Sequence, residues 1–168
     1  RMPVVCGTTG WLAHKAAADA LATDLKVGFL YASNFSLAVN LFFSINERLS
    51  QLMAPYEQFT PRVHEIHHTG KKDAPSGTAI TAAEGIVQHV PRFHGWSMEP
   101  TAKQVQITAE RIDPYFGKHT VTYQSDNDEL SLTHEAKSRQ GFAEGAVIAA
   151  EWLQGKSGSY SMRDVLGL

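Results

Sequence analysis

The residues best suited to chemistry lie between positions 63 and 79, where the sequence reads VHEIHHTGKKDAPSGTA. This stretch holds three histidines, two lysines and a Ser-Gly-Thr step, all of which donate protons or bind anions. Pro61 and Pro75 bracket the histidines and lysines, and proline disfavours a continuous helix through them. We therefore expect a strand that carries the histidines, followed by a turn.

The composition becomes helical directly after Pro75, and Ser76 is suited to cap the new helix. The backbone N–H groups of Gly77 and Thr78 then lie at a positive helix end, which favours a bound anion. Lys71 or Lys72 adds a full positive charge nearby. These residues predict a pocket for a small carboxylate or phosphate, with a histidine placed to move a proton.

Residues 64–68, His-Glu-Ile-His-His, also satisfy the H-E-x-x-H pattern of zinc peptidases, in which both histidines share one helix face. Pro61 and Gly70 leave too few residues for that helix. In a strand, Glu65 and His67 point to one side, while His64 and His68 point to the other. A zinc hydrolase using His64, Glu65 and His68 is thus a remote alternative, a solvated surface strand is another, and we predict no metal site.

The run from Glu65 to Ala79, E-I-H-H-x-x-K-x-D-A-P-S-G-T-A, resembles the signature of the dihydrodipicolinate reductase family. Four further segments agree with the family in order: Gly-Thr-Thr-Gly at 7–10, Ala-Ser-Asn-Phe at 32–35, Ser-Arg-x-Gly-Phe at 138–142 and Asp-Val-Leu at 164–166. The resemblance covers nearly the whole chain. At 111–113 the chain reads Arg-Ile-Asp where the family commonly has Arg-x-Gly. This difference affects the expected shape of the loop and not the expected reaction.

The resemblance implies a 4-hydroxy-tetrahydrodipicolinate reductase of lysine and diaminopimelate biosynthesis. Such an enzyme passes a hydride from NADPH or NADH to a cyclic unsaturated dicarboxylate and gives tetrahydrodipicolinate. By the same resemblance, His67 is the proton donor and acceptor and Lys71 the second proton donor. The expected substrate-binding residues are His68, Ser76, Gly77 and Thr78. The expected cofactor-binding residues are Gly7, Thr8, Thr9, Ala32, Ser33, Asn34, Phe35, Arg139 and Phe142.

The order of predicted elements indicates an α/β fold joined to an α+β fold. Strands at 3–6 and 26–31, a glycine turn and a helix at 13–23 form a remnant of a doubly wound, Rossmann-type domain. A second domain has a mixed sheet from strands at 59–68, 105–111, 117–125 and 129–135, with helices at 36–53 and 77–90. The final helix, 142–153, returns to the first domain. We assign 1–37 and 139–168 to dinucleotide binding and 38–138 to substrate binding and oligomerisation.

In the helix at 36–53, an apolar stripe predicts the side that faces the core: Ala38, Leu41, Phe42, Ile45, Leu49 and Leu52.

The composition of the chain limits the kinds of partner that it can bind. The formal charge of −2 argues against nucleic acid, and no apolar run approaches the ~20 residues of a membrane span. The single cysteine, Cys6, fits a reducing cytoplasm. The resemblance implies a homotetramer formed through the sheet of the second domain.

No G-x-G-x-x-G pattern occurs in the chain, and the sequence resembles roughly the last two thirds of a complete reductase. We expect this chain alone to bind NADPH poorly or not at all, because a helix end beside a glycine-rich loop is the main anchor for a pyrophosphate. An alternative is a catalytically inactive fragment that keeps dicarboxylate binding and assembly. No residue in the sequence indicates a preference between NADH and NADPH.

Overall fold

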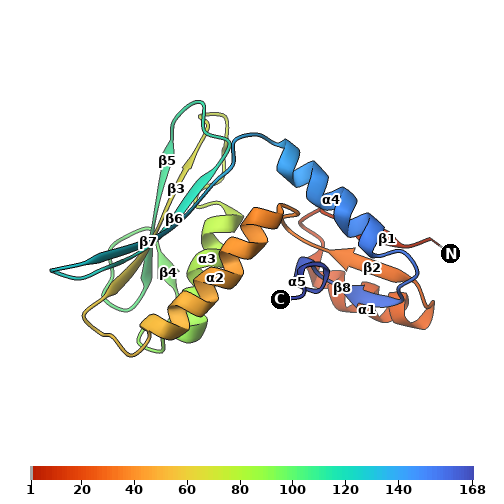
Figure 1. Cartoon of the computed structure of the whole chain (residues 1–168), viewed down its shortest axis with the longest axis horizontal. Coiled ribbons are helices and arrows are strands. Elements are labelled where there is room, and N and C mark those ends of the chain that lie inside the picture. The colour runs from red at the N-terminus through yellow and green to blue at the C-terminus, as the bar shows by residue number, and fades with distance from the viewer. Residues whose placement is uncertain (1) are drawn as a thin grey trace. The chain divides into compact units, whose positions relative to one another are not determined.

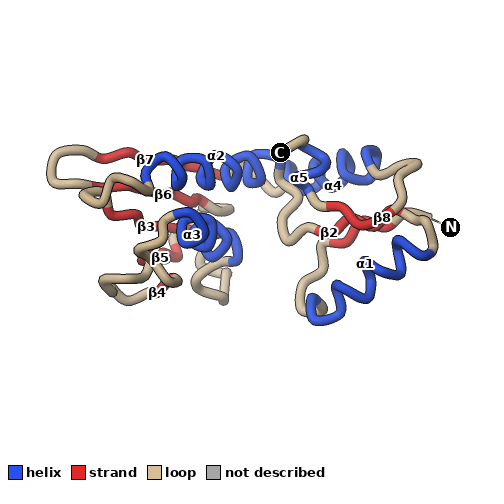
Figure 2. The backbone as a smooth tube through the Cα atoms, turned by 90° about the horizontal axis from the view of Figure 1, so that it is seen from below, coloured by secondary structure: helices blue, strands red, loops and turns tan. Residues whose placement is uncertain are grey.

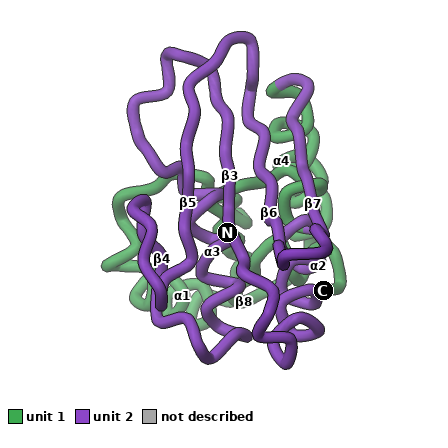
Figure 3. The backbone as a smooth tube through the Cα atoms, turned by 90° about the vertical axis from the view of Figure 1, so that its left-hand side faces the viewer, with its two compact units in different colours: residues 1–40, 139–168 green, residues 41–138 purple. Residues whose placement is uncertain are grey.

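The structure, a computed structural model, describes residues 2–168, and these form two compact units (Figure 3). Of the described residues, the first unit contains 2–40 and 139–168, and the second contains 41–138. These limits lie within a few residues of the domain boundaries expected from the sequence. The functions assigned to the two domains remain predictions.

The first unit is a three-stranded parallel sheet in the order β1-β2-β8, made of β1 (Val4–Cys6), β2 (Gly28–Tyr31) and β8 (Gly158–Tyr160). The short 3-10 helix η1 (Leu12–His14) leads into α1 (Lys15–Asp24), which covers one face. The helices α4 (Gln140–Trp152) and α5 (Met162–Leu166) lie on the other face (Figure 2). Leu30, Ala149, Leu153 and Met162 form its buried core.

The second unit is a five-stranded mixed sheet in the order β4-β5-β3-β6-β7, with helices on one face only (Figure 1). Its strands are β3 (Thr60–His67), β4 (Trp96–Ser97), β5 (Val105–Arg111), β6 (Lys118–Gln124) and β7 (Glu129–Glu135). The strands β4, β5 and β3 are parallel, and β6 and β7 are antiparallel to their neighbours. This arrangement confirms the predicted combination of an α/β part with a mixed-sheet α+β part.

The helices of the second unit are α2 (Leu37–Met53), which begins in the first unit, and α3 (Gly77–His89). The alternation of β3 places Val63, Glu65 and His67 on one side, as the sequence predicts, and the structure shows that this side faces the helices and is buried. Val63, Ile107, Val121 and Tyr123 build the apolar core with Ala79, Ala82 and Ile86 of α3. The opposite face of the sheet carries polar side chains and remains open.

The predicted core stripe of α2 is wrong in most positions. Leu41, Ile45 and Leu52 are 43%, 52% and 53% exposed, and Ala38 is exposed as well, whereas the buried face includes the polar residues Asn46 and Ser50. Asn46 donates to the carbonyl oxygen of Ala82 at 2.8 Å, and Ser50 accepts from the Tyr123 hydroxyl at 2.9 Å. Because these hydrogen bonds offset the desolvation of the polar groups, the helix turns a mixed face to the core.

Candidate active site

The helix-covered face of the second unit's sheet changes from apolar to polar near the carboxyl end of β3. The strand register sets Glu65 opposite His119 of β6, and His119 opposite His134 of β7. His67 lies two residues beyond Glu65, and its partner on β5 is Arg111. Side chains directly opposite one another on one face of a sheet are in contact range, so the register itself builds a cluster of titratable groups.

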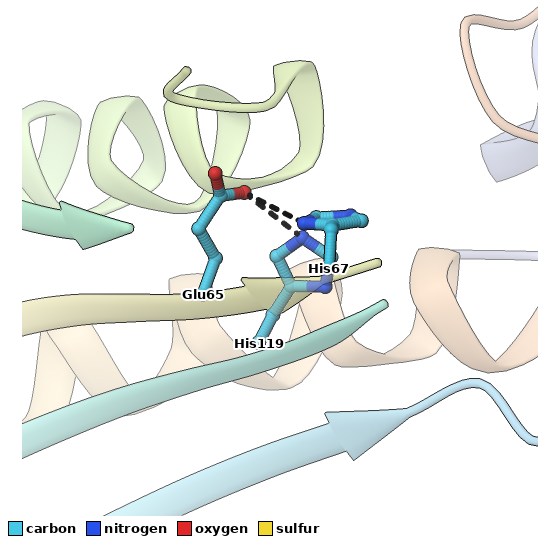
Figure 4. Close-up of side chains that lie close together, drawn as sticks. All are labelled: Glu65, His67 and His119. Carbon is cyan, nitrogen blue, oxygen red and sulfur yellow. Dashed lines mark ion pairs between the residues drawn. The ribbon is translucent and has the colours of Figure 1, made fainter. Parts of the chain in front are cut away.

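Glu65 is fully buried and lies at the centre of this cluster (Figure 4). Its oxygens accept from the backbone N–H of Ser76 at 3.1 and 3.2 Å and from Arg111 Nη2 at 3.2 Å. His67 Nδ1 and His119 Nε2 lie 3.4 and 3.6 Å from Oε2. Burial works to raise the pKa of Glu65, but the contacts with His119 and Ser76 outweigh it and hold the pKa at about 2.

Burial lowers the pKa of His67 to about 4, and the attraction of Glu65 offsets only part of that effect. The positive charges of Lys71 and Arg111 act in the same direction as burial. His67 is therefore neutral at pH 7 in this state. A negative ligand beside the ring would favour the protonated form, so a proton donor can arise here when an anion binds.

Arg111 and Asp113 hold the turn that follows β3. Arg111 donates to the carbonyl oxygens of Lys71 at 3.2 Å and Asp73 at 2.5 Å, as well as to Glu65. Asp113 accepts from the N–H and hydroxyl of Thr69 at 3.1 and 2.7 Å. Lys71 pairs with the Asp73 carboxylate at 2.8 Å. These contacts fix the turn relative to the sheet.

Ser76 caps α3 as the sequence predicts, and its buried hydroxyl accepts from the N–H of Ala79 at 3.2 Å. The same hydroxyl lies 3.1 Å from His119 Nε2. Ser76 is thus fully engaged with the protein, while Gly77 is exposed and Thr78 is half-buried at the helix start. At the N-terminal end of α3, Gly77 and Thr78 thus remain accessible, and the N-terminus of a helix is a kind of site that favours anions.

The structure ties His67, Lys71 and Ser76 into one network through Glu65 and Arg111, with Gly77 and Thr78 next in the chain. His68 is half-buried one residue beyond the end of β3. Sequence reasoning assigned no role in the reductase to Glu65, Arg111 or His119, and it considered Glu65 only for the zinc hydrolase alternative. The signal was present, because Glu65 and Arg111 lie in the family motifs, but only the strand register shows that they meet.

The zinc hydrolase alternative is wrong, since residues 64–67 belong to a strand and not to a helix. His64 points away from Glu65 and contacts Thr108 at 2.8 Å and Glu110 at 3.4 Å on the open face. Among residues 2–168, a different trio, Glu65, His67 and His119, offers ligand atoms within 4.8 Å of one another. Arg111 and the Ser76 N–H already compensate the charge of Glu65.

The predicted cofactor residues all lie in the first unit. The strands β1 and β2 are parallel neighbours, so residues 7–9 and 32–35 emerge at the same edge of the sheet. Gly7 approaches the Phe35 ring, since a Cβ at Gly7 would lie 3.0 Å from it. Gly145 of α4 contacts the Phe35 carbonyl so closely that a Cβ would lie 1.8 Å from its oxygen.

These glycine contacts bring the two loops together with α4, which has Arg139 as its N-cap residue and Phe142 in its first turn. Thr8, Thr9 and Ser33 are exposed, whereas Ala32 and Phe35 are buried and offer backbone groups only. Asn34 is occupied locally, accepting from the N–H of Ser36 at 2.9 Å. Hydroxyl and backbone groups at the carboxyl ends of parallel strands fit a nucleotide ligand.

Fold and site together define an α/β protein in which a parallel nucleotide-binding type of sheet is joined to a mixed sheet with an acid–base cluster. The family model "Dihydrodipicolinate reductase, C-terminus" matches residues 38–166. The chain belongs to the dihydrodipicolinate reductase family, whose members are NAD(P)H-dependent oxidoreductases.

Similar proteins named 4-hydroxy-tetrahydrodipicolinate reductase include one from Christiangramia forsetii, 48% identical over 166 residues, covering 98% of this chain and 70% of that protein. One from Methanosarcina barkeri is 38% identical over 171 residues, covering 98% of this chain and 64% of that protein. The dipicolinate-bound dihydrodipicolinate reductase of Paenisporosarcina sp. TG-14 has the same fold. Its TM-score is 0.74 at 24% identity, with 97% of this chain and 64% of that one covered.

These comparisons confirm the family and the reductase function predicted from the sequence. None of them tests the individual site residues, which remain predictions. None of the helices in the described part of the chain has the length and apolar character that a bilayer crossing needs.

Proposed function

We propose that the second unit binds the cyclic dicarboxylate substrate of the reductase and supplies the protons of the reaction. The observation that carries this proposal is the convergence, at the carboxyl end of β3, of an imidazole, an ammonium-bearing turn and the start of α3. A ligand with two carboxylates needs two positive sites, and His68 with Lys71 and the Gly77–Thr78 step provide them.

The nicotinamide of NADPH or NADH supplies the hydride when it is bound, and we propose Gly7, Thr8, Thr9, Ala32, Ser33, Asn34, Phe35, Arg139 and Phe142 as its contacts. The negative charge that the hydride leaves on the substrate must be neutralised by a proton. His67, protonated once the dianion is in place, gives that proton, and Lys71 is the second donor. Gly77 and Thr78 hold one carboxylate throughout.

Calorimetric titration of this chain with dipicolinate tests the proposal, because the reagent carries both carboxylates and requires no cofactor. Binding should persist in a chelator. His68→Ala and Lys71→Ala should each weaken it by about tenfold or more, since a charged hydrogen bond contributes about 1.5–3 kcal/mol. Lys72→Ala is the matched control, because Lys72 is exposed beside Lys71. Equal effects of the two lysine variants would refute the assignment.

We further propose that the reductase acts in the cytoplasm and assembles as a homotetramer through the open face of the second unit's sheet. This face carries hydroxyl side chains, among which Thr120 contacts Thr133 at 3.0 Å and Thr122 contacts Ser131 at 3.4 Å. A mixed sheet with helices on one side only leaves such a face available for a second sheet. The unpaired Cys6 fits a reducing compartment.

A further inference from the structure

Glu65 connects the two proposed halves of the site, the proton donor and the anion-binding helix. Its carboxylate is fully buried and accepts from Ser76 N–H at the start of α3 and from Arg111. A buried charge is stable only when it is paired and hydrogen-bonded, and these two donors meet that need. Glu65 is therefore ionised and fixed in place before any ligand arrives.

His67 presents Nδ1 to this carboxylate. The nitrogen is buried and lies 3.4 Å from Oε2, an ion-pair distance, and it makes no hydrogen bond to any of residues 2–168. A lone pair on Nδ1 would face the lone pairs of an anionic oxygen, whereas an N–H is attracted to it. The geometry thus favours a hydrogen on Nδ1, which leaves Nε2 without one.

Nε2 of His67 faces Gly117 of the loop before β6. A Cβ at Gly117 would lie 3.1 Å from Nε2 and 3.3 Å from the adjacent ring carbon. Gly117 also has a φ of +153°, a conformation that other residues rarely adopt. Glycine at this position therefore keeps the Nε2 edge of the ring clear of a side chain.

His119 presents the other ring nitrogen, Nε2, to the Glu65 carboxylate. Its Nε2 lies 3.1 Å from Ser76 Oγ and 3.6 Å from Glu65 Oε2, and Ser76 Oγ already accepts from Ala79 N–H. Its Nδ1 is buried with no partner in the described chain. Placing the hydrogen on Nδ1 would leave a buried donor without an acceptor, which is unfavourable, so the hydrogen belongs on Nε2.

We propose that Glu65 is the positioning residue of this site and holds two neighbouring histidines in opposite tautomers, His67 as Nδ1–H and His119 as Nε2–H. His67 then gains its catalytic proton from solvent at Nε2 and gives it from there to the substrate. The N–H bond breaks, the electron pair of the substrate carbanion forms the new C–H bond, and the ring returns to the neutral Nδ1–H form. This inference rests on the role proposed above for His67.

A metal ion would require the reverse arrangement. Zinc between Glu65, His67 and His119 needs lone pairs, not hydrogens, on the ring nitrogens that face the carboxylate. The tautomers proposed here and a bound metal ion exclude each other. A measurement of which ring nitrogens carry hydrogen therefore distinguishes the two arrangements.

Nitrogen-15 histidine NMR of this chain at pH 7 tests the inference without cofactor or turnover. We expect hydrogens on Nδ1 of His67 and Nε2 of His119. In Glu65→Gln the hydrogen of His67 should move to Nε2, since the anion that holds it is gone. Glu110→Gln is the matched control, because Glu110 faces His64 at 3.4 Å on the open side, and it should leave His67 unchanged.

An Nε2–H form of His67 in the unmodified chain, or stoichiometric zinc on these rings, overturns the inference even if Glu65→Gln fails to fold. An unchanged His67 in a folded Glu65→Gln variant does so too. Dipicolinate titration keeps the outcomes distinct. If both histidines have the proposed tautomers but dipicolinate does not bind, only the proposed function is refuted. If dipicolinate binds but the tautomers differ from those proposed, only the role of Glu65 is refuted.

Discussion

His67 is a buried imidazole, and its burial, which the neighbouring Glu65 carboxylate offsets only in part, has a measurable consequence for stability. Its pKa is lowered to about 4 in the folded chain, from an ordinary value of about 6.5. Between these values the unfolded chain binds a proton that the folded chain does not. The free energy of unfolding therefore falls as the pH is lowered from about 6.5 toward 4.

We predict that His67→Gln removes this part of the acid sensitivity. Urea unfolding at pH 7 and pH 5 should show the parent chain losing about 1–2 kcal/mol more than the variant. Glu65, whose pKa is held at about 2, adds a loss of stability only at lower pH, from about 4.5 downward. His64→Gln, on the open face, is the control and should keep the parent's loss. An identical loss in His67→Gln would contradict the burial argument.

The individual site residues show how far sequence reasoning reaches. The alternation of β3 separated His67 from His64, and the cap at Ser76 followed from residue type, because both are local properties. The roles of Arg111 and His119 depend on strand register between segments about 50 residues apart. Periodicity within one segment carries no information on that register, so these residues could be noticed but not placed.

At the scale of elements, α2 shows that the buried face of a helix cannot be predicted from its apolar spacing alone. Its apolar spacing predicted a core face that the structure exposes at four of six positions, because Asn46 and Ser50 find partners on α3 and β6. Burial of a polar residue depends on a donor or acceptor supplied by another element. Helix existence and length were predicted closely, whereas the rotation of the helix about its axis could not be.

The contact of α4 with the loop after β2 gives a prediction for an element. Gly145→Ala places a methyl group 1.8 Å from the Phe35 carbonyl oxygen and should destabilise the first unit by at least about 2 kcal/mol. Gly141→Ala, in the same helix with nothing within 4 Å, should be neutral or stabilising by up to about 1 kcal/mol. Urea unfolding followed by Trp152 fluorescence compares them, and similar stabilities would contradict the close packing.

At the scale of the whole molecule, the second unit uses the two faces of one sheet for different purposes. The helix-covered face holds the core and the acid–base cluster, and the open face is proposed as the assembly surface. Since β3 and β6 contribute alternate side chains to both faces, the site and the proposed interface share the same two strands. We expect assembly to stiffen the strands that carry His67 and His119.

The proposed tetramer can be tested by one charge at the centre of the open face. Thr120→Glu should shift sedimentation from tetramer to smaller species, because four assembled copies would bury like charges near one another. Gln51→Glu adds the same charge on an exposed position of α2 and should leave the assembly intact. A monomeric parent chain, or a tetramer that survives Thr120→Glu, would rule out this face.

The fixed turn between β3 and α3 has a further consequence. Asp113, Arg111 and Glu65 together fasten Thr69, Lys71, Asp73 and Ser76, so the ordering entropy of this turn is spent during folding and not during capture of the substrate. By the proposed function, we therefore expect a dicarboxylate to bind without rearrangement of the backbone at this turn. We expect the rate of binding to depend on diffusion and charge, and the selectivity to depend on the spacing of the positive groups.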